Sequence, residues 1–397
     1  MTLRASKPAF NVREKLSELE RPIGLKGSEL MRSETAQEAR DLVSAGRKNL
    51  IINGDLRVWQ RGTSATLDSS TNMKHKTADR WNHWHSTDGA VTESRSTDVP
   101  TGAGFYYSLK HEVTTADTSI AATQYHAHRY DIEGYDVAHL MWGTSQAKPI
   151  TVSFWVKSSV TGDYGFCIRP GANSLRFYVD TLKINQANTW EYKTFTVPGC
   201  IDGTWEKTNS AGMQVQISHV MGTTYQTSSL RQWINTIDVS PTTQVNWMAT
   251  VGNTWYITGL QVEEGTLATD FEHRPYSEEF SLCQRYYQYV GTLSLHTWSH
   301  QIADSSGMRI QQFTYPGGHM RATPTLTYYD ASSGGNLNKW AVEDPDRIAI
   351  NTNITISPQH NQYQFSGGFK YPGAVANFSL GQSGWAAAYR MELSAEL

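Results

Sequence analysis

Alternation of apolar and polar side chains is the feature that most constrains the fold of this chain. Over 150–157 (ITVSFWVK), apolar side chains stand at every second position from Ile150, and Thr, Ser, Trp and Lys occupy the positions between them. A period of two places all the apolar residues on one face of a strand. The pattern returns over 164–168, 175–179, 213–218 and 255–262. Short alternating strands separated by turn residues predict a β-sandwich or jelly roll.

Composition agrees with this class and argues against others. The chain has 397 residues, enough for two or three domains with real cores. Charged residues are 18% and aromatic residues 11%, which favours an all-β protein with broad polar faces. A net charge of −3 without a basic block does not point to nucleic acid. No apolar run approaches the roughly 18 residues of a membrane-spanning helix.

The first residues also lack the apolar core of a signal peptide. Cys167, Cys200 and Cys283 are widely spaced and form neither a CxxC pair nor a disulfide framework. Both observations predict synthesis in a reducing cytoplasm, with any export by a route other than a signal peptide, such as inside an assembled particle.

Residues 1–48 have a helical rather than a β pattern. Two short helices are predicted, the first ended by Pro22 and the second capped by Ser33 and ended by Gly46. Their apolar positions include Val12, Leu16, Leu19, Leu42 and Val43. Helices of about three turns are not stable alone in water, so this segment needs a partner. We expect an anchoring segment, with a helical lid on the sandwich as the alternative.

The rest of the chain divides into three parts. Residues 49–276 are predicted to form the jelly-roll domain. Residues 277–290 suggest a helical bridge, because Phe280, Cys283 and Tyr287 recur at spacings of three and four. Residues 291–397 are rich in glycine and long enough for a small C-terminal β-sandwich. The predicted fold is therefore mainly β, with a short N-terminal helical segment.

Five motifs stand out along the chain: NLIINGD at 49–55, ADRW at 78–81, SFWVKS at 153–158, FEHRPYSEE at 271–279 and CQRYY at 283–287. They resemble a recurrent module of bacteriophage tail fibres, which is itself similar to the jelly-roll carbohydrate-binding modules of glycosidases. The resemblance implies that 49–55 and 259–276 hold the opening and closing strands of one sandwich.

Two further segments extend the resemblance. The stretches 320–326 (MRATPTL) and 392–397 (ELSAEL) resemble a fibre tip domain, and 26–32 (KGSELMR) resembles a virion-anchoring segment of short-tailed phages of marine bacteria. The resemblance implies a homotrimeric structural protein that carries a glycan-recognising region. The loop around His83–His85 and the stretch 125–142 match no motif, so no sugar contact is implied there.

Sugar recognition requires an aromatic platform surrounded by amides or carboxylates. Alternation places Trp155 opposite Phe154, and Gln214 and Gln216 also face away from their apolar neighbours. Burial of Trp155 under the N-terminal segment or a neighbouring subunit is the alternative, and Trp81 is expected in the core. The predicted glycan contacts are Trp84, Trp142, Trp155, Tyr328, Tyr329 and Trp340.

The pairs His83/His85 and His126/His128 are the strongest metal candidates. On a strand, each pair would place both imidazoles on one face. Without a third ligand in the sequence pattern, polar surface histidines are the default interpretation.

Jelly-roll carbohydrate modules often hold a structural calcium ion, and the resemblance leaves calcium open here. The nearest carboxylates are Asp55, Asp270, Glu263 and Glu264. Calcium needs six or more oxygen ligands, partly from backbone carbonyls, which the sequence does not reveal. No other cofactor is predicted.

No catalytic motif is present: the chain has no Gly-x-Ser-x-Gly elbow, phosphate loop or His-Glu-x-x-His. We therefore expect no enzyme, but a tail fibre in the phage virion that attaches to a bacterial surface glycan. Its expected partners are other tail proteins, copies of itself and the polysaccharide. A purely structural virion component and a capsule-degrading hydrolase are the alternatives.

Overall fold

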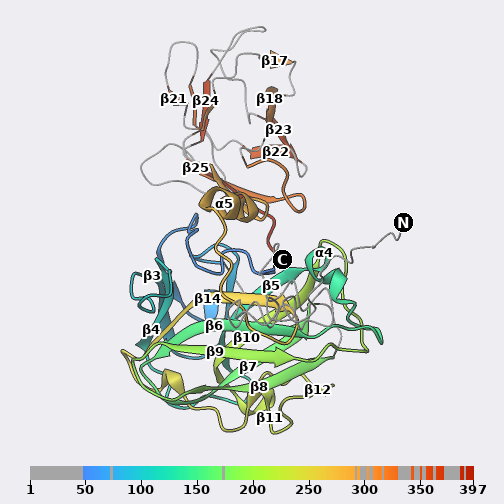
Figure 1. Ribbon diagram of the computed structural model, residues 1–397. Coiled ribbons are helices and arrows are strands. Elements are labelled where there is room, and N and C mark those ends of the chain that lie inside the picture. The colour runs from blue at the N-terminus through green and yellow to red at the C-terminus, as the bar shows by residue number, and fades with distance from the viewer. Residues whose placement is uncertain are drawn as a thin grey trace, which may run out of the picture.

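The computed structural model describes most of residues 48–290 and parts of 291–397 (Figure 1). The described residues are 48–71, 75–171, 175–290, 293–295, 302–303, 307–314, 317–329, 341–343, 349–350, 355–360, 364–370, 385–388 and 390–397. The structure is mainly β, as predicted. The predicted N-terminal helices, with Val12, Leu16, Leu19, Leu42 and Val43, lie outside the described residues. No helix in the described ranges is long and apolar enough to cross a membrane.

Two six-stranded sheets form a jelly-roll β-sandwich, the body of the protein. Sheet A has the order β1 (Ser64–Leu67), β3 (Ala90–Ser96), β4 (Ser108–Thr115), β14 (Thr254–Glu264), β6 (Ile150–Ser158) and β9 (Glu191–Val197). Sheet B has the order β12 (Trp233–Ile234), β8 (Phe177–Ile184), β7 (Gly162–Pro170), β10 (Ala211–Met221), β5 (Tyr125–Glu133) and β2 (Trp81–His85). Neighbouring strands are antiparallel, and β14 lies between β4 and β6 although it comes last in the body.

Short elements connect these strands. They are η1 (Ser69–Thr71), α4 (Gly134–Val137), η2 (Ala138–Leu140), η3 (Thr223–Tyr225), β11 (Gln226–Thr227), β13 (Ser240–Pro241) and η4 (Trp247–Ala249). Strands β11 and β13 pair in parallel as a separate two-stranded sheet.

The core fills the space between the two sheets. The core face predicted over 150–157 is confirmed, since Ile150, Val152, Phe154 and Val156 all belong to the core. The positions between them are covered too, apart from the half-buried Trp155. Phe154 and Phe166 both stack on Phe195, the latter with ring centroids 4.0 Å apart. The three cysteines are free and buried, in agreement with their spacing in the sequence.

The opening motif at 49–55 is not the strand that was expected. Its backbone makes two bonds with β14, from Leu50 N to Val262 O (2.9 Å) and from Leu260 N to Gly54 O (3.0 Å), and side chains satisfy several of its other backbone groups. The Asn49 side-chain oxygen accepts from the backbone N–H groups of Ile51 (3.0 Å) and Val262 (3.1 Å). The Asn49 side chain thus replaces part of the sheet ladder here. The closing segment is a strand only as far as Glu264, where β14 ends.

The two motifs nevertheless meet in space. The Arg274 guanidinium donates to the carbonyl of Ile51 (2.8 Å) and to that of Asn49. The Glu272 carboxylate accepts from the backbone N–H groups of Lys48 (2.9 Å) and Asn49 (2.6 Å). Charged side chains of the closing motif therefore hold the opening loop in place.

The predicted bridge at 277–290 is helical only in its first part. Helix α5 spans Tyr276–Gln284, and β15 (Tyr287–Val290) comes after it. The last residues are a strand because they pair with β25 (Arg390–Ser394), which also pairs with β19 (Thr325–Tyr329). These three strands form one sheet next to α5.

Two further sheets lie beyond it, at the end of the molecule opposite β11 and β12 (Figure 1). One contains β16 (Leu293–Leu295), β24 (Trp385–Ala388), β20 (Ala341–Glu343) and β21 (Ala349–Ile350). The other contains β17 (Ile302–Ala303), β18 (Gly307–Thr314), β23 (Gln364–Lys370) and β22 (Thr355–His360).

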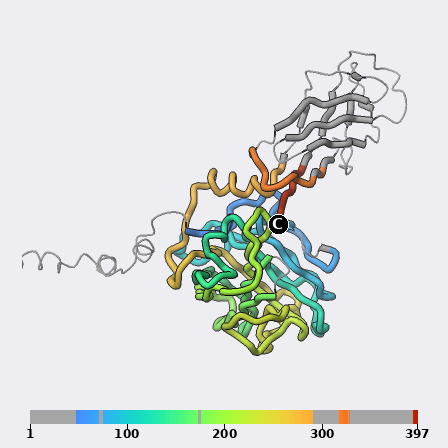
Figure 2. The backbone as a smooth tube through the Cα atoms, turned by 90° about the vertical axis from the view of Figure 1, so that its right-hand side faces the viewer, coloured from blue at the N-terminus to red at the C-terminus, as the bar shows by residue number. Residues whose placement is uncertain are grey.

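The C-terminal residues return from these sheets to the body (Figure 2). The Glu396 carboxylate accepts from Arg61 (2.8 Å) and from Arg80, whose side chain is only 1% exposed. The Arg80 guanidinium also lies 3.6 Å from the ring centroid of Tyr286. Burial alone would raise the pKa of Glu396, but the charges of His75, Arg80 and Arg61 outweigh it and hold that pKa well below its usual range.

Candidate functional site

The outer face of sheet B carries a set of polar side chains that the register places together. Asn82 is opposite Arg129, and Arg129 is opposite Gln216. In the next row, Gln214 lies between Asp131 and Arg169. Cross-strand partners share a face of a sheet, and residues two apart on a strand do so too. We call this set the polar face; its members are Asn82, Trp84, Arg129, Asp131, Arg169, Gln214 and Gln216.

Trp84 lies close to two guanidinium groups on the polar face. The guanidinium carbon of Arg129 is 4.2 Å from the centre of the Trp84 ring, and that of Arg169 is 5.7 Å away. Arg169 also lies 4.7 Å from the ring of Phe177. These are cation–π distances, so the aromatic ring and both charges form one packed unit.

The two arginines differ in their partners. Arg129 is paired with Asp131, with 3.1 Å between Nε and Oδ1. Arg169 has no carboxylate partner among the described residues. Burial lowers the pKa of Arg169, and the charge of Arg129 acts in the same direction. An arginine in this setting favours an anionic ligand, which would supply the missing charge.

The polar face also holds polar atoms without hydrogen bonds. Within the described part of the chain, no partner is present for the buried atoms Asn82 Oδ1, Trp84 Nε1, Arg169 Nε, Gln214 Oε1 and Gln216 Oε1. Each such atom costs roughly 1–3 kcal/mol if it stays unsatisfied. The set contains both donors and acceptors, and a hydroxyl-rich ligand offers both. Trp84 and Arg169 are half-buried, so a ligand meets them before it reaches the two glutamines.

An apolar cluster borders the polar face. It contains Ala127, Cys167, Phe177, Val179, Met221 and Val239, against which Trp84, Tyr125, Tyr225, Leu230 and Ile234 pack. Tyr125 links the two regions, because its ring centroid lies 5.7 Å from those of both Trp84 and Tyr225. Aromatic rings at this border give the site a flat apolar edge.

The structure corrects the placement of Trp142. This residue was predicted as an exposed loop platform, but it is 3% exposed and belongs to the core. Its ring packs edge-on against Trp205, at 4.5 Å between centroids, and its Nε1 donates to the carbonyl of Lys148 (2.6 Å). A tryptophan held in this way cannot stack on a ligand.

Trp84 and Trp155 are both half-buried, but they lie on opposite outer faces of the sandwich. Trp84 belongs to β2 of sheet B, in a strand rather than the loop that was expected. Trp155 belongs to β6 of sheet A, next to Tyr192 at 5.2 Å between ring centroids. The two tryptophans therefore cannot contact one short glycan. Trp81 is in the core, as expected.

The tip candidates remain predictions. Tyr328 and Tyr329 lie on β19, where they pair with Met391 and Arg390, but their side chains are outside what the structure describes. Trp340 falls wholly outside the described residues.

The histidine pairs are not surface residues, contrary to the default interpretation. His83, His85, His126 and His128 are all buried, because β2 and β5 are neighbours and the pairs face the core together with Trp81 and Tyr130. His83 lies opposite His128, and His85 lies opposite His126.

The carboxylates considered for calcium do not form a ligand set in the described residues. Asp55 pairs with Arg57, and Glu264 pairs with Lys148 (2.9 Å). Glu263 accepts from both the N–H (2.9 Å) and the hydroxyl (2.6 Å) of Thr269. Protein donors thus occupy oxygens of Glu263 and Glu264, whereas the buried Asp55 Oδ1 has no hydrogen-bond partner in the described residues.

Sequence reasoning missed Asn82, Arg129 and Arg169. Alternation along 125–133 could have separated Arg129 from His126 and His128, as it separated Gln214 and Gln216 from their neighbours. Bringing Asn82, Arg129 and Arg169 together requires the order of the strands β2, β5, β10 and β7, which the sequence alone does not give.

Comparison with known proteins returns similarities of structure only. No family model matches the sequence, and no curated protein matches it. The enzymatically active domain of tailspike protein 4 from bacteriophage CBA120 is 13% identical with a TM-score of 0.28, and the match covers 55% of this chain and 21% of that one. The carbohydrate-binding module CBM4 is 16% identical with a TM-score of 0.28, over 54% of this chain and 98% of the module. A family 11 carbohydrate-binding module from Clostridium thermocellum, solved with a mixed-linked tetrasaccharide, is 13% identical with a TM-score of 0.25, over 52% and 98%.

Proposed function

We propose that this protein is a phage tail-fibre component that attaches the virion to a bacterial surface glycan through the polar face of sheet B. The observation that carries the proposal is the group of buried polar atoms without partners around Trp84. The motifs at 49–55 and 271–279, which resemble those of fibre modules, support the assignment to a virion.

Recognition on this face would combine stacking and hydrogen bonds. The half-buried ring of Trp84 offers apolar surface for the CH groups of a pyranose ring. The amide oxygens of Gln214 and Gln216 accept from sugar hydroxyls, and Trp84 Nε1 donates to one. Arg169, without a carboxylate partner in the described part of the chain, favours a carboxylated sugar such as a uronic acid.

Several copies of the chain would strengthen a weak single site. If the copies form the homotrimer that fibres usually adopt, avidity raises the apparent affinity without a new contact. Native mass measurement should then give about three times the chain mass of 44.5 kDa. A monomer would remove this part of the proposal.

The test is the substitution Gln214→Met, measured on an array of acidic bacterial polysaccharides. Loss of one hydrogen bond should weaken binding roughly twofold to tenfold, the equivalent of about 0.5–1.5 kcal/mol. Stability should stay equal or rise, because methionine has a similar shape and removes a buried amide oxygen without a partner. Opposite signs for binding and stability identify a ligand site.

Gln146→Met is the matched control, since Gln146 is exposed in the loop before β6 and does not belong to the polar face. Equal glycan binding by wild type and both variants would contradict a site at Gln214. Release of reducing ends from a bound polysaccharide would instead establish the hydrolase alternative. Absence of binding to any acidic or neutral polysaccharide would favour a purely structural component.

A further inference from the structure

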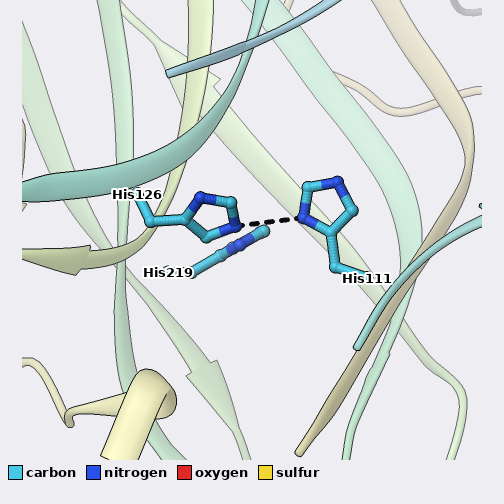
Figure 3. Close-up of side chains that lie close together, drawn as sticks. All are labelled: His111, His126 and His219. Atoms are coloured by element: carbon cyan, nitrogen blue, oxygen red, sulfur yellow. Dashed lines mark hydrogen bonds between the residues drawn. The ribbon is translucent and has the colours of Figure 1, made fainter. Parts of the chain in front are cut away.

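A cluster of buried imidazoles joins the two sheets of the body, away from the polar face. His111 comes from β4 of sheet A, and His126 and His219 come from β5 and β10 of sheet B. All three are 0% exposed. Figure 3 shows their rings converging, with His219 beside the contact between the other two.

The distances suit a tetrahedral metal ion. One nitrogen from each of the three rings lies within 4.8 Å of the others. His111 Nδ1 and His126 Nε2 are 3.1 Å apart. Zinc–nitrogen bonds of about 2.0–2.1 Å at tetrahedral angles separate two ligand nitrogens by about 3.3 Å. Small side-chain shifts would therefore bring all three nitrogens into coordination range.

The outer hydrogen bonds of two rings aim their lone pairs at one point. His111 Nε2 lies 2.9 Å from a Glu93 oxygen, and Thr77 donates to the other oxygen of Glu93. A carboxylate accepts, so His111 Nε2 carries the proton and Nδ1 is the lone pair. His85 Nδ1 lies 3.0 Å from His126 Nδ1, and His85 can donate its Nε2–H to the carbonyl of Gly89 (3.1 Å). His85 Nδ1 is then a lone pair that accepts a hydrogen bond. His126 then donates from Nδ1, which leaves Nε2 as a lone pair facing His111.

Without a cation, His111 Nδ1 and His126 Nε2 cannot both present lone pairs to each other, so His126 Nε2 must carry a proton and donate to His111 Nδ1. Thr87 would then donate to His85 (3.1 Å). His85 would donate to His126, His126 to His111, and His111 to Glu93. That arrangement turns the lone pair of His85 Nε2 toward the Gly89 carbonyl. It also leaves His219 as it is, with no hydrogen-bond partner in the described residues for either ring nitrogen. A metal ion gives His219 a partner. It also lets His85 Nε2 carry a proton and donate to the Gly89 carbonyl, so that two lone pairs no longer face each other there.

The buried charge of Glu93 also supports a bound cation. Glu93 is a buried carboxylate, and in the described chain its ion-pair partner is His111 alone. As a metal ligand His111 is a neutral imidazole, so Glu93 lacks a compensating positive charge that a divalent cation would supply.

We infer that His111, His126 and His219 bind a zinc-like divalent transition metal ion in the core of the sandwich. Glu93 and His85 orient two of the ligands from behind, as hydrogen-bond partners of zinc-bound histidines commonly do. His128 is the candidate for a fourth ligand. Both of its nitrogens lack hydrogen-bond partners in the described residues, and its ring centroid lies 4.1 Å from that of His111 and 4.7 Å from that of His219.

The site is structural rather than catalytic, since closed nitrogen sets without an exposed position hold zinc for stability. The first experiment measures the metal content of the full chain, purified without chelators and with any histidine tag removed. About one zinc ion per chain is expected. Chain refolded with Zn²⁺ should melt at a higher temperature than chain refolded with a chelator, and chain refolded with Co²⁺ should show the visible absorption of tetrahedral cobalt.

The second experiment uses variants. His219→Gln should lose the bound metal, whereas the control His139→Gln, on an exposed side chain, should keep it. His128→Gln should change the cobalt spectrum if His128 is the fourth ligand, and an unchanged spectrum would remove His128 from the set. Should His219→Gln fail to fold, the wild-type measurements decide alone. Wild-type chain without metal, without a zinc-dependent melting temperature and without a cobalt spectrum would overturn the inference.

Discussion

The buried ion pair between Glu396 and Arg80 gives the most direct test of how the C-terminal residues are attached to the body. Glu396→Gln keeps the shape of the side chain and removes its charge. Arg61 would retain Asp79 at 3.5 Å as a partner, but Arg80 would keep the carbonyl of Asp131 (2.6 Å) and the rings of Tyr130 and Tyr286, and no carboxylate in the described residues. The cost is therefore determined by Arg80, a guanidinium that is 1% exposed and left without a carboxylate.

Removing one partner of a buried pair costs about 3–5 kcal/mol. The glutamine amide still offers one acceptor, so we expect a loss near the lower end of that range. Glu112→Gln is the matched control, because Glu112 pairs with Lys110 on the surface and its side chain is 42% exposed. That change should cost less than about 1 kcal/mol.

Urea unfolding followed by tryptophan fluorescence would measure both variants, since the packed tryptophans of the body report its unfolding. The double variant Arg80→Met/Glu396→Gln should be less destabilised than the sum of its single changes, because no buried charge is then left without a carboxylate. Equal stability of the Glu396→Gln and Glu112→Gln variants would refute the reasoning, and so would additivity in the double variant.

Three further changes test other parts of the structure. Trp142→Ala should cost about 3–5 kcal/mol in urea unfolding, whereas Trp84→Ala should cost less and weaken glycan binding; a silent Trp142→Ala would contradict its burial. Burial lowers the pKa of His75 from 6.5 to about 4. Between pH 6.5 and 4 the unfolded chain therefore binds a proton on His75 that the folded chain does not. His75 should contribute up to about 3 kcal/mol to the stability that wild type loses as pH falls from 6.5 to 4, and His75→Gln should lose that much less than wild type. Gly54→Ala places a Cβ 2.2 Å from the carbonyl oxygen of Leu260 and should lower the melting temperature by an amount equivalent to at least about 1–3 kcal/mol; an unchanged melting curve would contradict this contact.

Local patterns predicted the fold class but not the site. The period of two around Phe154 gave both the strand and its buried face, because adjacent residues of one strand determine them. The prediction that Trp142 is an exposed platform was wrong because its burial depends on Trp205, which is far away in the sequence. The composition of the loop gives no information about that contact. The same limit hid the histidine cluster. His111 and His219 are single histidines in their own strands, and only the packing of sheet A on sheet B brings them to His126.

The position of β14 has a consequence for how the chain folds. β4 and β6 flank this strand, yet β14 is synthesised long after β6 ends at Ser158. Until β14 arrives, sheet A is two separate halves, each with an open hydrogen-bonding edge that can pair with another chain. The pairing of β14 with β4 and β6 also closes long loops, because both partners lie far earlier in the chain, and closing long loops slows folding. We therefore expect newly made body to depend on chaperones until Glu264 has emerged, and truncations before β14 to aggregate rather than to form a smaller sandwich.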